Sequence, residues 1–405
     1  MSSTTVAYDP YAPDVQADPY PFYTALRRDA PVYYVESLGA YAVSRHADVR
    51  RVMHDHATFS SAAMAELVSR PVEIGRDDNV FEQPVEGSIS IVGLDGASHT
   101  RLRTIVNRAF TPRHIGELEG KMRATARSYV KALATRGAGD VMAEFAVQFP
   151  TAVIAAILGV DPARRADFRR WSEHMMRAVF EPLSAEQRET VAQSGSQMGE
   201  YLDAVIAERA AHPGDDMVSL LLRAELEGGA LTREELAVFV FTLLVAGSIT
   251  TAYLIGSAVI QLVQDPACQA AVRTEPGLVA AVAEETLRHQ SPVQMMFRTA
   301  TCDVDVAGTR IPEGATLLPL IGSANRDERV FTNPDRFDYG RAPGDALAFG
   351  HGVHYCLGAA LARLEARVAL DELVRASDVL EPVGALERIT SLVFRGPTVL
   401  PIRFH

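Results

Sequence analysis

The spacing of apolar residues predicts a chain that is mostly helical and has a few short strands. From residue 115 to residue 230, apolar positions recur with a helical period, and Gly, Pro and Asp separate the periodic runs. These runs predict a large helical lobe. The expected helices cover residues 115–134, 143–158, 164–180, 185–211 and 217–226.

Strand-like patterns lie nearer the two ends of the chain. Residues 20–28 and 46–56 are helical, whereas 32–35 and 40–43 read as a hairpin. Further strands are expected at 303–306 and 316–320, and a last hairpin at 392–395 and 398–403. We therefore predict one domain over residues 1–405, mainly α with small β-sheets. Its smaller β-rich lobe comprises mainly residues 19–60, 300–322 and 378–405.

One apolar segment, residues 236–263, contains no charged side chain. It is long enough to span a bilayer. However, Thr and Ser residues interrupt it, and acidic Glu235 and Asp265 flank it, so the positive-inside pattern is missing. We predict a helix buried inside a soluble protein. Residues 1–18 have no basic region followed by an apolar run, so we expect no signal peptide or N-terminal anchor.

The composition narrows the class of protein further. A hydrophobic content of 48% over 405 residues is enough for a packed interior, and the net charge of −12 argues against a nucleic-acid surface. The three cysteines, Cys268, Cys302 and Cys356, form no CxxC pair. This usage argues against a disulfide framework or a zinc ribbon, and it fits a reducing compartment such as the cytoplasm.

The most distinctive segment is FGHGVHYCLG, residues 349–358. Cys356 precedes a predicted helix over residues 357–376, and the positive end of a helix favours a thiolate. Taken alone, a buried structural cysteine is the commoner case. The ordered spacing of Phe, Gly, His and Cys resembles the haem-ligand signature of the cytochrome P450 family, and the LARLE sequence at 361–365 continues it as in family members.

The resemblance extends over nearly the whole chain, because segments 95–113, 246–251, 285–288, 325–337 and 349–365 occur in the family order. It implies the cytochrome P450 fold and a haem b whose iron takes the Cys356 thiolate as its axial ligand. The helix bearing His99 and Arg103 would face a haem propionate, as would Arg298. The haem-binding residues implied are His99, Arg103, Arg298, His354, Phe349, Gly350 and Gly358.

Residues 246–251, AGSITT, resemble the family's oxygen-binding segment. The catalytic residues implied are Ala246, Gly247, Ser248, Thr250 and Thr251. Gly247 would let the backbone approach the haem, and Thr250 would lie beside dioxygen. Without the resemblance, a glycine or threonine within a helix is a packing or kink feature. Many members have an acidic residue before the threonine, whereas this chain has Ile249. We therefore expect protons to reach Thr250 through water, Ser248 or a substrate hydroxyl.

Glu285 and Arg288 have i,i+3 spacing, which is usually a surface ion pair. The resemblance implies instead a buried structural cluster of Glu285, Arg288 and Arg336. It also implies a substrate pocket, of which residues 60–92 form part of the roof; plain core packing is the alternative for its apolar members. The pocket residues expected are Leu243, Val293, Met295, Met296, Phe297, Val393 and Phe394, so the substrate is expected to be hydrophobic.

The resemblance thus implies a haem-thiolate monooxygenase that hydroxylates or epoxidises a terpenoid, steroid, fatty acid or polyketide. Gly350 and Gly352 begin a dinucleotide fingerprint, but Tyr355 occupies the place of its third glycine. Electrons would therefore come from a separate ferredoxin and its NAD(P)H-dependent reductase. A local basic docking patch is expected at Arg101, Arg108, Arg113, Arg363 and Arg367, and the alternative for each is an ordinary solvated arginine. We expect a cytoplasmic monomer that binds neither nucleic acid nor membrane; the alternatives are a peroxide-driven enzyme and a non-oxygenating haem protein.

Overall fold

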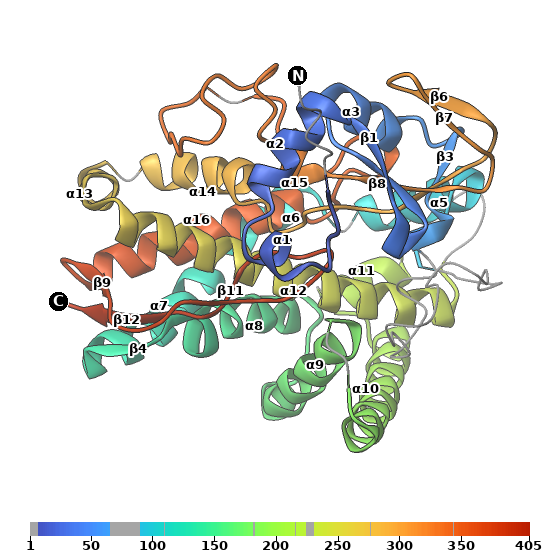
Figure 1. Ribbon diagram of the computed structural model, residues 1–405. Coiled ribbons are helices and arrows are strands. Elements are labelled where there is room, and N and C mark those ends of the chain that lie inside the picture. Colours follow the sequence, from blue (N-terminus) through green and yellow to red (C-terminus); the bar gives the residue numbers. More distant parts are fainter. Residues whose placement is uncertain are drawn as a thin grey trace.

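A long helix, α12 (Arg233–Gln264), runs through the middle of the molecule, and α8 (Gln148–Ile157), α14 (Leu278–His289) and α16 (Ala359–Ala376) pack against it (Figure 1). Thr232 begins it with a capping box, in which the Thr232 hydroxyl accepts from Glu235 N and the Glu235 carboxylate accepts from Thr232 N. Residues 251–260 are all buried. By length and composition α12 could cross a membrane, but in this fold other helices enclose it, as predicted.

The computed structural model describes residues 7–64, 90–108, 110–180, 183–214, 216–223, 231–275, 277–342 and 344–405. Most of the expected pocket roof at 60–92, and the end of the expected helix at 217–226, lie outside these residues. The remaining described helices of the helical lobe are α5 (Gly96–Asn107), α6 (Pro112–Glu117), α7 (Glu119–Arg136), α9 (Arg165–Phe180), α10 (Ala185–Ala211), α11 (Met217–Leu222) and α13 (Pro266–Thr274).

Two predicted helices are divided in the structure. The run at 115–134 becomes α6 and α7, which meet at Leu118, and the run at 143–158 begins as a π-helix (Met142–Ala146) before α8. Gly116 and Gly120 flank the first break, and glycine weakens a helix interior. The fold class, mainly α with small sheets, is confirmed.

A mixed sheet forms the core of the smaller lobe. Its strand order is β1 (Val32–Val35), β2 (Ala40–Val43), β8 (Thr316–Pro319), β5 (Arg298–Ala300) and β3 (Phe59–Ser60). The first two strands pair antiparallel as predicted, while β2 and β8 pair in parallel. Helices α1 (Pro13–Ala17), α2 (Tyr20–Asp29), α3 (His46–His54) and α15 (Ile321–Ala324), and the two-stranded β6 (Val304–Val306) and β7 (Thr309–Ile311), complete this region.

The predicted last hairpin is wrong. Residues 392–395 form no strand; Phe394 makes only an isolated bridge with Val293. β11 (Pro397–Val399) pairs with β10 (Glu387–Arg388), and β12 (Pro401–Phe404) lies between β4 (Ala138–Asp140) and β9 (Leu380–Pro382). The strands pair in this way because both backbone groups of Leu400 bond to the segment at 140–141. Its N–H donates to Asp140 Oδ1 (3.0 Å), and its carbonyl accepts from Val141 N (2.9 Å).

The packing of these C-terminal strands also differs from the expected lobes. Leu380, Leu400, Ile402 and Phe404 belong to the same apolar cluster as α12 and α16. Within residues 378–405, Val393 instead packs with α2 and the mixed sheet. Most of this C-terminal segment is therefore attached to the helical lobe, and we had expected it in the β-rich lobe.

Candidate active site

A cavity of about 280 Å³ lies where α12 and α5 face the loop that precedes α16. It brings together residues that are far apart in sequence, from Met53 to Glu365. Of the site residues expected from the sequence, those that line it are Cys356, His99, Arg103, Arg298, His354, Phe349, Gly350, Gly358, Ala246, Gly247, Thr250, Thr251, Leu243, Val293 and Met296.

The loop before Cys356 is held in place by backbone contacts. Cys356 N donates to Phe349 O at 2.9 Å, and a 3₁₀ turn (Gly352–His354) shapes the intervening chain. Gly352 has φ of 78°, and a Cβ there would lie 3.0 Å from His54 Cα. Glycine is therefore required for both the turn and the close approach to α3. This packing fixes the direction in which the thiol enters the cavity.

The Cys356 sulfur is accessible from the cavity, although protein encloses it on its other sides. Burial raises the pKa of the Cys356 thiol, while the Gly358 N–H and the guanidinium groups of Arg103 and Arg363 oppose the shift. We had expected the helix N-terminus to favour the thiolate. The Gly358 N–H acts in that direction, but desolvation is the larger effect, and α16 begins only at Ala359. A bound metal cation would reverse the balance.

Buried nitrogen groups face the same cavity. The rings of His99 and His354 are 4.1 Å apart between centroids, and His354 Nε2 lies 3.5 Å from Asp95 Oδ1. Burial, followed by the neighbouring His354 and Arg103, lowers the pKa of His99 to about 4, so this imidazole is neutral at pH 7. His99 Nε2 finds no hydrogen-bond partner among the described residues.

Arg298 is a second buried group with unused hydrogen-bonding capacity. Its side chain is 2% exposed, and Nη1 donates to the carbonyl of Phe297 at 2.7 Å. Its Nε has no partner in the part of the chain that the structure describes. Burial lowers the pKa of Arg298 to about 10, so it stays charged at pH 7. A buried, incompletely paired cation is costly unless a ligand supplies the anion.

These residues fit a haem group. The thiol can ligate iron, and Arg298, Arg103 and the two imidazoles offer donors to its two carboxylates. A Cβ added at Gly358 would meet nothing within 4 Å, so the loop leaves open space beside the sulfur.

Of the expected oxygen-binding segment of α12, residues 246–251, four residues line the cavity and two do not. Thr250 Oγ1 lines the cavity and donates to Ala246 O at 2.7 Å. A Cβ at Gly247 would lie 3.1 Å from Ile154 Cδ1, so this glycine accommodates α8 as well as lining the cavity. Ser248 is 1% exposed and does not line the cavity. Ile249 packs against the main apolar core.

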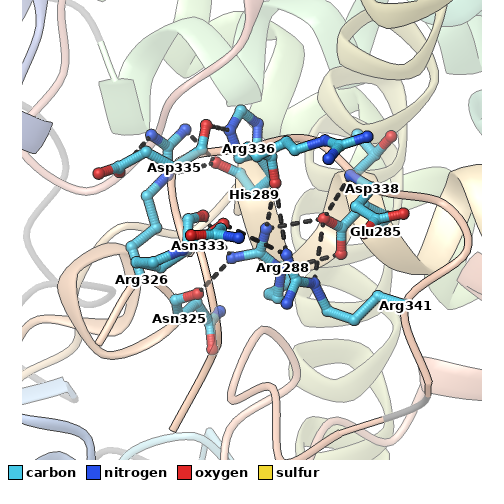
Figure 2. Close-up of polar contacts among 12 residues, drawn as sticks. Glu285, Arg288, His289, Asn325, Arg326, Asn333, Asp335, Arg336, Asp338 and Arg341 are labelled. Carbon is cyan, nitrogen blue, oxygen red and sulfur yellow. Dashed lines mark hydrogen bonds and ion pairs between the residues drawn. The ribbon is translucent and has the colours of Figure 1, made fainter. Parts of the chain in front are cut away.

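Glu285 and Arg288 form a buried ion pair on α14 (Figure 2). Arg288 Nε and Nη2 donate to the two carboxylate oxygens of Glu285, at 2.8 and 2.7 Å. Its Nη1 donates to the carbonyls of Asn325 and Pro334 at 2.9 and 2.8 Å. Asp338 N donates to Glu285 Oε1 at 2.9 Å. The pair thus holds the loop after residue 325 against α14.

The expected third member of this cluster, Arg336, needs correction. Its side chain is exposed, and it takes part through its carbonyl, which accepts from Arg288 Nη2 at 3.1 Å. The second guanidinium beside Glu285 is that of Arg341, whose Nε lies 3.4 Å from Oε1. The reason is the turn at Asn333, where φ is 48°, which directs the carbonyls inward and the Arg336 side chain outward (Figure 2).

Several expected pocket residues lie elsewhere. Met295, Phe297 and Val393 are buried in the apolar cluster beneath the mixed sheet, and Phe394 borders it; none of these described residues lines the cavity. Of residues 293–297, only Val293 and Met296 line the cavity. Two of the polar lining residues were not predicted: Thr242, one helical turn before Ala246, and Glu365, two turns after Gly358. Their helical spacing from predicted site residues was the available signal.

Glu365 is a carboxyl group 1% exposed to solvent, and its Oε2 has no partner among the described residues. Burial raises the pKa of Glu365 well above the ordinary value and so favours the uncharged form.

The proposed basic patch is largely neutralised by ion pairs. Arg113 Nε lies 3.1 Å from Glu117, Arg363 Nε 2.5 Å from Glu284, and Arg367 Nη2 2.7 Å from Glu119. Arg101 is paired with Glu235.

Comparison with known proteins gives a consistent result. The family model described as Cytochrome P450 matches residues 53–394. The chain is 40% identical over 353 residues to the erythromycin C-12 hydroxylase of Saccharopolyspora erythraea, covering 86% of this chain and 84% of that protein.

Solved structures are similar over almost the full length. Cytochrome P450 CYP109Q5 from Chondromyces apiculatus has a TM-score of 0.85 and 39% identity, with 98% of each chain covered. CYP109E1 from Bacillus megaterium in complex with testosterone has a TM-score of 0.86 and 30% identity, covering 96% of this chain and 99% of that one.

Proposed function

Since the chain belongs to the cytochrome P450 family and is a monooxygenase of that family, we propose that it hydroxylates or epoxidises a hydrophobic small molecule. The observation that supports this best is the convergence of the Cys356 thiol, the incompletely paired His99 and Arg298, and an apolar wall on one cavity. One relative is named an erythromycin hydroxylase, and another was crystallised with testosterone. These names support a polyketide or a steroid as the substrate class, and a role in secondary metabolism.

The family implies haem, and we propose that Cys356 is its axial ligand. His99, Arg103, Arg298 and His354 would hold its carboxylates, and Phe349, Gly350 and Gly358 would shape the loop around it. When bound, the haem supplies the activation of dioxygen. Leu243, Val293 and Met296 exclude water and position the substrate.

Thr250 is proposed as the hydroxyl that passes protons into the cavity, with Ala246, Gly247 and Thr251 forming the wall around it. Its present donation to Ala246 O must be exchanged for a bond to water before it can do so. Because Ile249 faces the core and Ser248 is buried away from the cavity, we propose water or a substrate hydroxyl as the source of these protons.

Electrons would come from a separate ferredoxin and an NAD(P)H-dependent reductase, and we propose a cytoplasmic monomer. Since the arginines of the expected docking patch are mostly in ion pairs, docking would exchange these pairs for new ones.

A second candidate is a peroxide-driven enzyme. The observation that favours it is Ile249, which leaves no carboxylate at the position where many family members have one.

The test is turnover of the purified haem protein with a steroid and a polyketide lactone, supplied either with a surrogate ferredoxin, reductase and NADPH, or with peroxide alone. Product that depends on NADPH supports the proposal, and product from peroxide alone supports the second candidate. Cys356→His should keep haem but lose the thiolate absorbance and the NADPH-dependent product. An unaltered spectrum in this variant would refute Cys356 as the ligand.

A further inference from the structure

Thr242 is a polar side chain in the cavity wall that has no task in the chemistry above. The other described polar lining residues are those assigned to the haem (His99, Arg103, Arg298, His354, Cys356), Thr250 and Thr251 of α12, and Glu365 of α16. Thr242 lies two turns before Thr250 on α12, between the apolar lining residues Phe239 and Leu243.

The hydroxyl of Thr242 has a defined set of contacts. Thr242 Oγ1 donates to Val238 O at 2.8 Å and lies 3.3 Å from Ser90 Oγ. Because the Thr242 proton is used, Thr242 can only accept further hydrogen bonds. An O···O distance of 3.3 Å is long for two hydroxyls, so the interaction with Ser90 is weak and easily exchanged.

The described lining residues that adjoin this hydroxyl and Ser90 in sequence are apolar. Ser90 is 4% exposed, and its neighbours Ile91 and Val92 line the same cavity as Phe239 and Leu243. An oxygen-bearing ligand placed here loses its water, and it is stabilised only if it bonds to a protein group. Among the described lining residues in this part of the cavity, the hydroxyl of Thr242 is the one such group.

We propose that Thr242, supported by Ser90, anchors an oxygen atom of the substrate and thereby selects which carbon is oxidised. This proposal rests on the proposed function. Eight residues separate Thr242 from Thr250, and a rise of 1.5 Å per residue places the two hydroxyls about 12 Å apart along the helix axis. The substrate class that fits is a rigid, largely hydrocarbon ring system with one hydroxyl or carbonyl about that far from the reacting carbon.

Whether a substrate hydroxyl or a substrate carbonyl binds more tightly depends on which hydrogen-bond donors are available at Thr242. A substrate hydroxyl can donate to Thr242 Oγ1 without any rearrangement. A substrate carbonyl needs a donor, and so Thr242 must turn its proton from Val238 O toward the ligand. We therefore expect an alcohol to bind more tightly than the matching ketone, and both more tightly than the parent hydrocarbon.

The experiment compares an androstane alcohol, the matching ketone and the parent androstane hydrocarbon. Affinities for the haem protein are measured by optical titration and by calorimetry. In the wild type the alcohol should bind about threefold to tenfold more tightly than the hydrocarbon. Thr242→Val, which keeps the side-chain shape, should abolish this preference, whereas Thr242→Ser should retain it. Leu243→Val is the matched control and should weaken alcohol and hydrocarbon alike.

The product pattern gives a second measurement. Wild type should oxidise the end of the ring system remote from the alcohol, and Thr242→Val should spread oxidation over several carbons. An unchanged alcohol-to-hydrocarbon ratio in Thr242→Val would overturn the anchor. A normal haem-thiolate spectrum without binding of any of the three compounds would overturn the substrate class alone. A protein without a haem-thiolate spectrum would overturn the proposed function, and this inference with it.

Discussion

Two clusters of buried cationic side chains differ in how completely the protein satisfies them. In the cluster around Glu285, the guanidinium of Arg288 bonds to a carboxylate and to three backbone carbonyls (Figure 2). In the cavity, Arg298 is as deeply buried, but the bond that it makes among the described residues is to the carbonyl of its neighbour Phe297. The described residues satisfy the first cluster, whereas in the second the Arg298 Nε has no partner among them and could bind an anion.

This difference teaches that burial of a charge does not by itself reveal its role. Removing a member of the complete cluster should damage the fold, because a partner is left buried and unpaired. Removing a member of the incomplete cluster should spare the fold and weaken ligand binding. Two predictions test this contrast, and a third concerns a buried acid in the cavity wall.

The largest effect is expected for Glu285→Ala. The variant leaves the Arg288 guanidinium buried without its carboxylate, so the free energy of unfolding should fall by about 3–5 kcal/mol and haem incorporation should be lost. Denaturant unfolding and haem content measure the two effects. Arg336→Ala is the control, since its side chain is exposed; a change beyond about 0.5 kcal/mol there would contradict the assignment of Arg341 to the cluster.

Arg298→Met should show the opposite behaviour. The haem-free variant should be as stable as the wild type or about 1 kcal/mol more stable, because an incompletely paired buried charge is gone. Haem should dissociate about tenfold faster or more, since a charge-assisted bond to a carboxylate is lost. Transfer of haem to an acceptor globin measures the rate.

The matched control for Arg298 is Arg326→Met. Arg326 is also buried, but it donates twice to the carbonyl of His289 and pairs with Asp335 at 3.2 Å. Its loss should destabilise the protein. Equal effects of the two substitutions on stability would remove the distinction between the complete and the incomplete cluster.

The smallest effect concerns Glu365, a buried acid in the cavity wall. The folded protein holds its proton at a pH where the unfolded chain releases it, because burial raises the pKa of Glu365. Its contribution to stability is therefore complete below the ordinary glutamate pKa and is lost as pH rises toward the raised value, by at most about 1.4 kcal/mol per pH unit. Glu365→Gln should remove this slope.

The measurement is the free energy of unfolding of wild type and Glu365→Gln from about pH 5 to about pH 8, where the variant should gain on the wild type as pH rises. Parallel curves would mean that Glu365 finds an additional partner that stabilises its charge. Glu365→Leu removes the polar group altogether. Comparing it with Glu365→Gln separates the effect of the titrating proton from the effect of burying a polar group.

Much of the fold could be predicted from the sequence because local patterns determine it. The periodic run at 185–211 gave α10 with the same bounds, and the hairpin of β1 and β2 follows from short-range alternation. The last hairpin could not be predicted in this way. Leu400 bonds to Asp140, which is remote in sequence, and that contact decides the pairing of β12.

The site residues likewise divide into those that local spacing predicts and those that depend on contacts remote in sequence. Glu285 and Arg288 share one helix face, so their pairing was predictable. Arg341 was not, because its approach to Glu285 depends on a turn with positive φ at Asn333. The pKa of the Cys356 thiol could not be predicted from the sequence. The sequence indicates a helix that begins nearby and lowers this pKa, but it does not show how far burial of the thiol raises it.

The parallel pairing of β2 with β8 has a consequence for how the protein is made. Residues 40–43 can find their partners at 316–319 only after most of the chain has left the ribosome. The cavity likewise needs α3, α5, α12 and the loop at Cys356, so no shorter fragment encloses it. Long-range contacts of this kind form slowly. Haem insertion should therefore be a post-translational event that follows closure of the chain upon itself.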